Sequence, residues 1–429
     1  MRTHRTFPFD SLSQIKSALL DWSKIHEDVV WLDSNKHQDQ YSSFEACLAV
    51  GAHQKIESFS GLHEFVGQQN DWLFGFFTYD VKNQIEDLTS ENNDDLGFTE
   101  LHFFQPQKII IIKEGQLHFM YLQSNDGEME RDYKAIFSQR TISTITLKVK
   151  NRVDIHPRIS KESYLNKAYQ FLEHIHRGDI YEANFCQEFY AEQAEIEPWG
   201  TFQQLNHISE PPFAVFLRSK DQYLLCASPE RYLKKVGEKV ISQPIKGTAP
   251  RSLNATEDKI ISEQLTNDLK ERTENIMITD LVRNDLSKSA LKGSVRVEEL
   301  CKPYAFKQVH QLISTVVSKV ENHKNPVELI QETFPMGSMT GAPKISAMKI
   351  IEELEETKRG LYSGAVGYFG PDGDFDFNVV IRSILYNASR MYVSFSVGSA
   401  ITSKSNPEKE YQECLLKAKA MRTVLEKGG

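Results

Sequence analysis

The stretch QPIKGTAPR, residues 243–251, places Lys246 between the apolar pair Pro244-Ile245 and the Gly247-Thr248 turn. A lysine on a surface strand is an ordinary solvated end group, but a lysine in an apolar pocket can act as a nucleophile. Glu230, in ASPERYL, follows a proline directly after a strand-like run. It is either a surface turn residue or a positioned general acid. A hairpin would bring Glu230 and Lys246 side by side.

Two pairs of glutamates have a spacing that suits a metal site. Glu271 and Glu274 are three residues apart in one helical pattern, and Glu410 and Glu413 are three apart in another. Residues at i and i+3 share a helix face, so two opposed faces would present four carboxylates. Such an oxygen-rich site suits Mg²⁺. The alternative is that all four lie on solvated helix surfaces, where most glutamates are found.

The segment FPMGSMTGAPK, residues 334–344, resembles a phosphate-binding loop but lacks the Gly-Lys-Ser/Thr ending that such a loop needs. Gly337 and Gly341 allow the backbone to turn, and a helix is expected after Pro343. Backbone N–H groups at that point would bind an anion such as a carboxylate. A plain turn before a helix explains the same residues.

Two single residues have both a structural and a chemical interpretation. Arg382 lies inside the strand-like run NVVIRSI, where it is either outward-facing or a buried clamp for a carboxylate. His310, in KQVHQLIS, is either a core histidine or an acid–base group. The residue types alone do not decide between these interpretations.

The composition limits the classes of function. The chain has 429 residues, 40% hydrophobic and 25% charged, and a formal net charge of −9. This acidic balance argues against a nucleic acid or an anionic membrane as a partner. The five cysteines form no CxxC pair, and no apolar run of signal-peptide length is present at the start. We therefore expect a cytoplasmic protein without disulfide bonds.

Helices and strands mix without a regular βαβ rhythm. Ser160 is expected to cap a helix that Gly178 ends, and Asn254 or Thr256 to cap a long helix that reaches about Asp280. Further helices are expected after Pro343 and from Asn406-Pro407. Strand-like runs are found at residues 181–190, 213–217, 223–227, 364–369, 374–385 and 391–397. This pattern predicts an α+β fold with a largely antiparallel sheet. Residues 1–155 form an expected variable, regulatory-like part, and residues 156–429 hold the groups with chemistry.

Several segments together carry a family resemblance. In order they are GDIYEANF (178–185), SPER (228–231), PIKGTAPR (244–251), ENIMITDLVRNDL (274–286), FPMGSMTGAPK (334–344), RGLYSGAVGYFG (359–370), VVIRS (379–383) and PEKEYQE (407–413). From about Ser160 to its end the chain thus resembles the chorismate-utilising enzymes, which include anthranilate, aminodeoxychorismate, isochorismate and salicylate synthases. The resemblance implies a two-layered sandwich of antiparallel sheets and helices, with the site in a cleft.

The resemblance also implies a ligand set. Mg²⁺ would be held by Glu274 and Glu413, with Glu271 and Glu410 nearby. The ring carboxylate of chorismate would bind the metal, and the enolpyruvyl carboxylate would bind backbone N–H groups near Gly398. The side chains and turns implied at the substrate are Gly247, Thr248, Thr340, Gly341, Tyr368, Arg382 and Lys417, with His310 near the ring.

Position 246 indicates a branch of the family. Anthranilate synthases have alanine there, whereas a lysine resembles aminodeoxychorismate synthase component I. Attack by Lys246 at C2 would release the C4 hydroxyl, protonated by Glu230, and ammonia could then add at C4 as the lysine leaves. The apolar neighbours and nearby Mg²⁺ are expected to lower the pKa of Lys246. The product would be 4-amino-4-deoxychorismate, a precursor of 4-aminobenzoate and folate.

Two departures from the family pattern stand out. Glu182 replaces the usual glutamine after GDIY, and isochorismate and salicylate synthases have a water-activating lysine there, so Glu182 speaks against water as the nucleophile. Ala400 alters the usual GAGI segment. We expect a separate glutamine amidotransferase subunit to deliver ammonia. The alternatives are an anthranilate synthase component I and a non-catalytic chorismate-binding subunit.

Overall fold

The computed structural model describes residues 1–37, 39–138, 153–307 and 309–427. Within these residues, twenty strands form one hydrogen-bonded network, and its ladders are antiparallel. The strands are interleaved with helices along the chain. The expected α+β class is therefore confirmed. The segment 139–152 lies outside the described residues.

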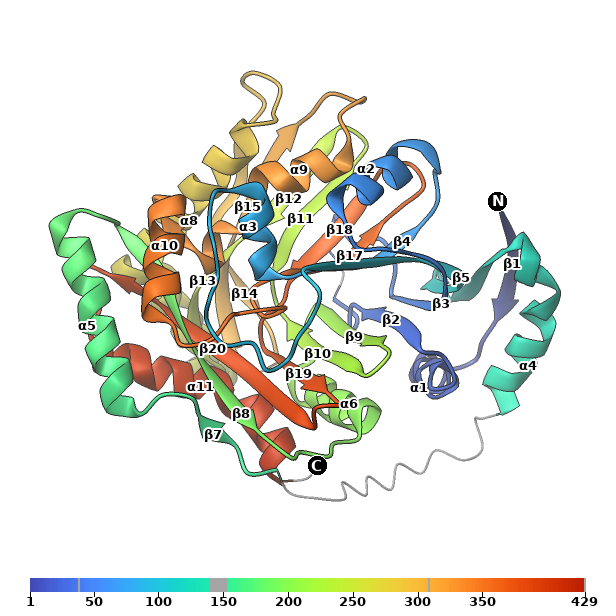
Figure 1. The fold of residues 1–429 in the computed structure, drawn as a ribbon, viewed down its shortest axis with the longest axis horizontal. Helices are drawn as coiled ribbons and strands as arrows, with labels where there is room; N and C mark the ends of the chain where they lie inside the picture. The colour runs from blue at the N-terminus through green and yellow to red at the C-terminus, as the bar shows by residue number, and fades with distance from the viewer. Residues whose placement is uncertain (38, 139–152, 308, 428–429) are drawn as a thin grey trace.

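The network has two limbs that meet at the long strand β5 (Leu101–Lys113), and the first limb runs through both halves of the sequence (Figure 1). Its strands, in spatial order after β5, are β3 (Ala46–Ile56), β2 (Asp28–Asp33), β9 (Phe213–Ser219), β10 (Gln222–Ser228), β19 (Ser383–Asn387), β20 (Tyr392–Thr402) and β8 (Glu182–Ala191), with the short strands β7 (His156–Pro157) and β16 (Gly341–Ala342) on β8. On the other edge of β5, β6 (Gln116–Leu122) and β1 (Arg2–Pro8) complete this side.

The second limb leaves β5 through a different neighbour. Its strands, in spatial order, are β4 (Leu73–Phe77), β17 (Ala365–Phe369), β18 (Phe375–Val379), β11 (Arg231–Val236), β12 (Lys239–Gln243) and β15 (Val309–Lys319), and β15 also pairs with β13 (Ile245–Pro250) and β14 (Arg296–Ala305). The strands that carry the expected nucleophile and its neighbours therefore lie at the far end of this limb.

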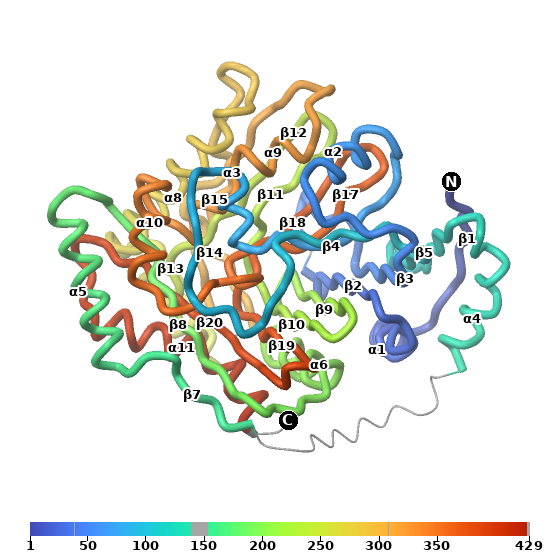
Figure 2. The backbone as a smooth tube through the Cα atoms, viewed as in Figure 1, coloured from blue at the N-terminus to red at the C-terminus, as the bar shows by residue number. Residues whose placement is uncertain are grey.

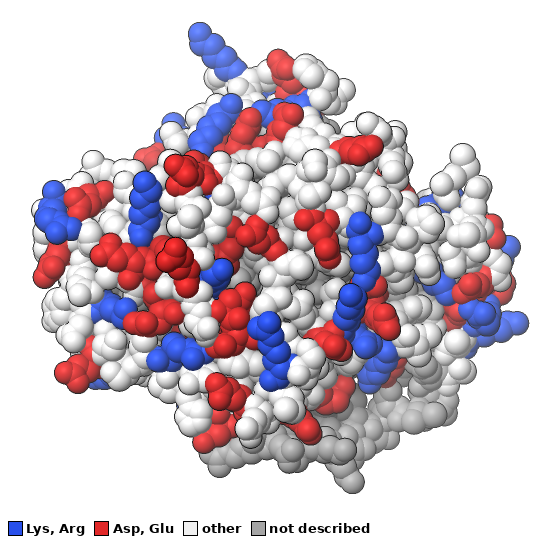
Figure 3. All heavy atoms as spheres, in the orientation of Figure 1, with Lys and Arg blue, Asp and Glu red and all other residues white. Residues whose placement is uncertain are grey.

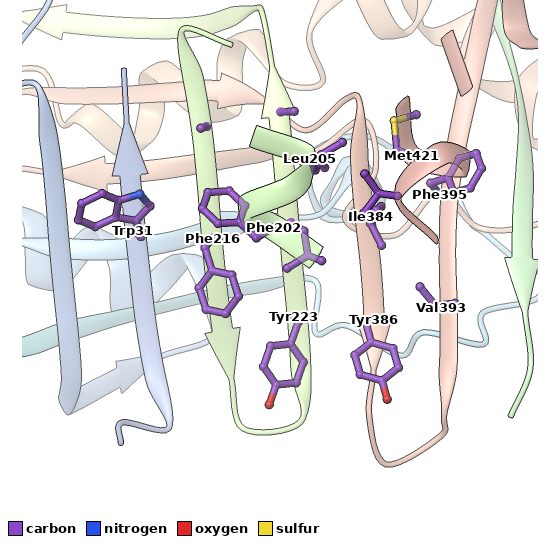
Figure 4. Close-up of a cluster of buried hydrophobic side chains, with 14 of the residues drawn as sticks. Trp31, Phe202, Leu205, Phe216, Tyr223, Ile384, Tyr386, Val393, Phe395 and Met421 are labelled. Carbon is purple, nitrogen blue, oxygen red and sulfur yellow. The ribbon is translucent and has the colours of Figure 1, made fainter. Parts of the chain in front are cut away.

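Strands of the first limb bury both of their faces. Val30 belongs to one hydrophobic core and its neighbour Trp31 to the other, and Leu224 and Leu225 divide in the same way. Successive side chains of a strand point to opposite faces, so each strand supplies two cores at once. Figure 4 shows part of the core to which Trp31 belongs. Each large side chain buried there contributes about 2 kcal/mol to stability.

Eleven helices cover the described parts of the sheet (Figures 1 and 2). They are α1 (Leu12–Ser23), α2 (Phe59–Gln68), α3 (Lys82–Ile85), α4 (Met129–Ser138), α5 (Lys161–Arg177), α6 (Pro198–Ser209), α7 (Ala255–Asn267), α8 (Leu269–Ser287), α9 (Pro326–Thr333), α10 (Lys344–Leu354) and α11 (Pro407–Lys427). Helix α11 packs on β20 beside α5 and α6, and α8 packs on β13 and β15. The expected sandwich of sheets and helices is confirmed.

Helix α5 has the ends that its sequence predicts. The Ser160 side chain accepts a hydrogen bond from the Ser163 N–H, at 3.1 Å, and Gly178 ends the helix in a left-handed conformation with φ +87°. Residues of the predicted apolar face, Tyr164 and Phe171 among them, are buried. Local capping and periodicity are sufficient to define this helix.

The long helix expected from Asn254 to about Asp280 is instead two helices. Asn254 caps α7 as predicted, but α7 ends at Asn267. Asp268 then caps α8, because its side chain accepts hydrogen bonds from the N–H groups of Lys270 and Glu271. An aspartate that competes for backbone N–H groups in this way starts a new helix rather than continuing the old one.

Among the described residues, no helix is both long and apolar enough to cross a membrane. On the face shown in Figure 3, basic and acidic side chains are interspersed rather than separated into large patches of one sign. The face therefore has the mixed charge of an ordinary solvated surface.

Candidate active site

Lys246 leaves the regular ladder of its strand at a bulge. The pairing of β13 with β15 shifts register between Ile245 and Thr248. Gly247, inside the bulge, has φ +97°, and a Cβ atom there would lie 3.2 Å from Glu271 Oε2. A glycine is required both for this backbone conformation and for the close approach of the carboxylate.

The bulge opens into a large cavity of about 1100 Å³. Strand β13, helices α8 and α11, and strand β20 all contribute to its wall. The predicted site residues that line this large cavity are Glu230, Lys246, Gly247, Thr248, Glu271, Glu274, Arg382, Gly398, Glu410, Glu413 and Lys417. Segments far apart in the sequence therefore place most of the predicted residues in one space.

Glu230 has the environment of a proton donor. It follows β10, and its side chain is buried at the cavity wall. Burial raises the pKa of the Glu230 carboxyl to about 7, and the Ser338 hydroxyl and the Lys246 ammonium oppose this rise. Burial penalises the charged form of a carboxyl. Glu230 can therefore carry a proton near neutral pH, as a general acid must.

Lys246 is surrounded by carboxylates. Its Nζ lies 3.3 Å from Glu182 Oε1, and the Lys246 side chain is mostly buried. Burial lowers the pKa of Lys246, but the carboxylates of Glu182, Glu274 and Glu413 outweigh burial, so the pKa is raised. Burial therefore acts on the pKa of Lys246 in the expected direction, but among the protein's own groups the net direction is the opposite one, because nearby negative charge favours the ammonium form.

The four predicted metal ligands face the large cavity from two helices. Glu271 and Glu274 come from α8, and Glu410 and Glu413 from α11. Within residues 1–37, 39–138, 153–307 and 309–427, their side chains are not gathered into a ready group of three ligands. Lys270 lies between the helices instead, with its Nζ 3.6 Å from Glu274 Oε1 and 3.3 Å from Glu410 Oε1.

The chemistry of these donors nevertheless fits Mg²⁺. Glu274 Oε1 is buried and has no hydrogen-bond partner within the described residues, and burial, the largest influence, raises the pKa of Glu274 to about 7. A buried carboxylate oxygen without a donor is costly, and a hard cation would satisfy it. Glu413 pairs with Lys417 at 2.7 Å, and Glu410 accepts a hydrogen bond from Ser399.

Arg382 and Lys417 bring positive charge to the cavity. The expected strand 374–385 is broken into β18 and β19, because Arg382 lies between them in a left-handed conformation with φ +54°. Burial lowers the pKa of Arg382, which remains a guanidinium at neutral pH. Lys417 Nζ donates a hydrogen bond to the Gly398 carbonyl at 2.8 Å. Such cations suit carboxylate ligands.

The segment 334–344 forms a wall beside the cavity. Ser338 and Met339, in the 3₁₀ turn Gly337–Met339, line the cavity, whereas Thr340 and Gly341 do not. The N–H groups of Met339 and Thr340 donate to backbone carbonyls within the turn. Lys344 pairs with the buried Asp285 at 2.6 Å. The N–H groups expected to bind an anion are therefore partly used inside the segment itself.

Thr340 and Gly341 lie next to β8 instead. The Thr340 carbonyl accepts a hydrogen bond from the Asn184 N–H at 2.7 Å, and Gly341 pairs with Ala183. A Cβ atom on Gly341 would lie 2.1 Å from the Glu182 carbonyl oxygen. Both residues therefore fix the strand that carries Glu182 rather than touch the space of the cavity.

His310 and Tyr368 are not placed at the cavity. His310 Nε2 is 2.9 Å from Asp258 Oδ1, while its strand neighbours Val309 and Gln311 line the cavity. Tyr368 lines a small cavity of about 170 Å³, and its hydroxyl lies 3.2 Å from Ser43 Oγ. The tyrosine that lines the large cavity is Tyr362, in the same RGLYSGAVGYFG segment.

Two charged groups at the site have no role in the prediction from sequence. They are Glu182, a departure from the family pattern, and Lys270. A charged residue inside the apolar run YEANFC was a signal for Glu182, because such a residue needs a buried partner. Lys270, next to Glu271, gave no comparable signal.

Residues 23–423 match the family described as chorismate binding enzyme, so the chain belongs to that family. The chain therefore uses chorismate.

Relatives within the family differ in their reaction. Aminodeoxychorismate synthase component 1 of Escherichia coli is 34% identical over 355 residues, which are 82% of this chain and 76% of that protein. Anthranilate synthase component 1 of Thermus thermophilus is 33% identical over 361 residues, 82% of this chain and 77% of that protein. The identities alone do not separate these two reactions.

Solved structures show the same fold. The anthranilate synthase component I structure from Streptococcus pneumoniae has a TM-score of 0.78 at 24% identity, covering 90% of this chain and 94% of that one. The menaquinone-specific isochorismate synthase from Escherichia coli has a TM-score of 0.79 at 15% identity, covering 99% and 95%.

Proposed function

We propose that this chain makes 4-amino-4-deoxychorismate from chorismate and ammonia, as an aminodeoxychorismate synthase component 1. The single observation that carries the proposal is the position of Lys246, whose side chain leaves the β13 bulge in the same cavity wall as Glu230. The family resemblance implies an alanine at this position in anthranilate synthases, and an alanine would offer no nucleophile. A lysine amine close to a protonated carboxyl supports addition at one carbon and departure at another.

The proposed reaction has two displacements. The Lys246 amine forms a bond to C2, both double bonds of the conjugated ring shift, and the C4 hydroxyl leaves as water with the proton of Glu230. Ammonia then forms a bond to C4 while the bond from C2 to Lys246 breaks. The new C4 ammonium returns a proton to Glu230. The sum is chorismate plus ammonia giving the amino product plus water.

Substrate binding is assigned to the cations and turns of the large cavity. Arg382 and the backbone near Gly398 would hold the enolpyruvyl carboxylate, and Gly247, Thr248 and Lys417 would hold the ring carboxylate. Glu274 and Glu413, with Glu271 and Glu410 nearby, would hold Mg²⁺, which supplies positive charge for a substrate carboxylate. His310, Thr340, Gly341 and Tyr368 lie outside the cavity wall and have no substrate contact in this proposal.

The ammonia is proposed to come from a separate glutamine amidotransferase subunit, in the cytoplasm. The name component 1 of the Escherichia coli relative supports a second component. The product would serve the synthesis of 4-aminobenzoate and folate.

The test is to incubate the purified chain with chorismate, Mg²⁺ and an ammonium salt at mildly alkaline pH. The product is identified by mass and by fluorescence, and glutamine replaces ammonium in a parallel sample. We expect aminodeoxychorismate with ammonium, none with glutamine, and none from Lys246→Ala. Anthranilate from the unaltered chain would overturn the proposal, and absence of any product together with absence of Mg²⁺ binding would favour a non-catalytic subunit.

A further inference from the structure

A buried carboxylate lies behind the proposed nucleophile. Glu182, on β8, is 1% exposed and does not line the large cavity. Its Oε1 lies 3.3 Å from Lys246 Nζ, so the lysine separates it from the space where substrate would bind. None of the steps above uses this residue.

The rest of the Glu182 carboxylate is poorly stabilised. Its Oε2 is buried and has no hydrogen-bond partner in the part of the chain that the structure describes. Burial raises the pKa of Glu182, and Lys246 opposes that rise. A buried carboxylate that depends on a single cation pays a large desolvation cost, which protonation removes. Glu182 is therefore suited to accept a proton.

The proposed nucleophile has the opposite need. The Lys246 ammonium contacts Glu182 of β8, and the carboxylates of Glu274 on α8 and Glu413 on α11 also act on it. Glu230, after β10, faces the same cavity and is the proton donor of the proposed reaction. The charges of Glu182, Glu274 and Glu413 favour the ammonium form, which has no lone pair for attack. Lys246 must lose a proton to become a nucleophile, and Glu182 is within reach of that proton.

We propose that Glu182 is a further catalytic residue, which takes a proton from Lys246 and thereby frees the amine to attack C2. This inference rests on the proposed function, in which Lys246 is the nucleophile. It also gives a chemical role to the carboxylate found where the family usually has glutamine.

The proton balance closes. The Lys246 ammonium gives one proton to Glu182 Oε1, which leaves a neutral amine beside a neutral carboxylic acid. Attack at C2 makes the amine a secondary ammonium, while Glu230 loses its proton to the leaving hydroxyl. When ammonia takes C4, Lys246 leaves C2 as a neutral amine. Glu182 keeps this proton through both displacements and returns it to Lys246 after the product has left the cavity.

A purely structural role for Glu182 makes a different prediction. A counter-ion that only holds the ammonium form would slow the reaction, so its removal would leave the rate unchanged or increased. A proton acceptor makes the amine available without release of a proton to bulk water. Loss of the acceptor then leaves only bulk deprotonation, which increases tenfold with each pH unit below the lysine pKa.

The experiment compares Glu182→Gln with the unaltered chain from pH 7 to pH 9.5, with saturating Mg²⁺ and ammonium salt. The quantity is the ratio of the two kcat/KM values for chorismate at each pH, because titration of ammonium and of Glu230 largely cancels in that ratio. We expect a loss of about a hundredfold at pH 7.5. The loss should shrink about tenfold for each unit of rising pH. A ratio that does not change with pH would overturn the inference.

Two variants keep the result interpretable. Glu188→Gln removes another buried carboxylate of β8, one that pairs with Arg158 at 2.9 Å, and its ratio should stay flat. Glu182→Asp keeps a carboxyl, so its ratio should also be flat even where the rate falls, and a rising ratio would count against the inference if Glu182→Gln does not fold.

The outcomes also separate this inference from the proposed function. If Lys246→Ala keeps full activity, or the product is anthranilate, the proposed function fails. If Lys246→Ala is inactive and the Glu182→Gln ratio is flat, only this inference fails.

Discussion

The large and small cavities treat buried charge in opposite ways. In the small cavity, Asp376 Oδ1 is 3.0 Å from Arg231 Nε, Asp376 Oδ2 is 3.0 Å from Lys234 Nζ, and Asp39 also pairs with Arg231. At the large cavity, Glu274 in its wall and Glu182 behind Lys246 each have a buried oxygen without a hydrogen-bond partner among the described residues. Burial opposes ionisation in both places, but the cations outweigh it for Asp376 and do not outweigh it for Glu274. The contrast indicates that the large cavity is arranged for bound groups and the small one for stability.

The largest expected effect separates two lysines, one from each region. Lys246→Met should lower kcat/KM for chorismate by at least about a thousandfold, since it removes the nucleophile. Lys234→Met should leave kcat/KM within a fewfold, because Lys234 contacts Asp376 and not the large cavity. Steady-state rates and thermal unfolding of both variants measure the difference. Comparable losses of rate in two folded variants would break the comparison.

The next effect concerns stability in the small cavity. The pKa of Asp376 is lowered: burial acts to raise it, but Arg231 and Lys234 outweigh burial. Asp376→Asn leaves these two cations without their shared partner, so the free energy of unfolding should fall by about 3–5 kcal/mol at neutral pH. The loss should diminish once the pH falls below about 3.9, the pKa of an unfolded aspartate, towards the lower pKa of the folded one. Denaturant unfolding at about pH 7 and about pH 3 measures it, and an unchanged midpoint at pH 7 would contradict the assignment.

The smallest effect has the opposite sign. Burial raises the pKa of Glu230 from its ordinary value of 4.5 to about 7, so the folded protein binds more protons between these values and the free energy of unfolding falls as pH rises through them. Glu230→Gln removes this penalty and should raise the free energy of unfolding by about 1–3 kcal/mol at pH 8. The gain should vanish near pH 4.5. Activity should fall in the same variant, so a gain in stability would accompany a loss of chemistry. Denaturant unfolding at pH 8 and pH 4.5 measures the change relative to the unaltered chain, and a variant whose relative stability is lower at pH 8 than at pH 4.5 would refute the prediction.

The sequence predicted those features that depend on local spacing. The cap and end of α5 follow from Ser160 and Gly178, and the four glutamates reach one cavity because residues at i and i+3 share a helix face. The α+β class followed from the mixture of patterns. These inferences needed no knowledge of which strands pair.

Two of the predicted site residues, His310 and Tyr368, are not placed at the large cavity. For His310 on β15 this depends on the face of the strand, because its neighbours Val309 and Gln311 line the cavity and successive side chains point to opposite faces. Tyr368 belongs to β17, which lines the small cavity and contributes no residue to the large one. Since both faces of these strands are buried, alternation of polarity does not reveal the direction. The pairing of Glu182 with Lys246 joins β8 to β13, which only the tertiary fold brings together.

The strand order has a consequence for how the chain folds. Strand β2 pairs with β9, and β4 pairs with β17, so residues before 155 complete two edges of the sheet formed by later residues. A chain shortened to residues 156–429 would expose both edges, with unpaired N–H and C=O groups ready to join another molecule. It would also lack more than a third of the buried residues of each hydrophobic core, Val30 and Trp31 among them. We therefore expect the two parts of the chain to fold cooperatively, because strand pairings between distant residues complete both cores.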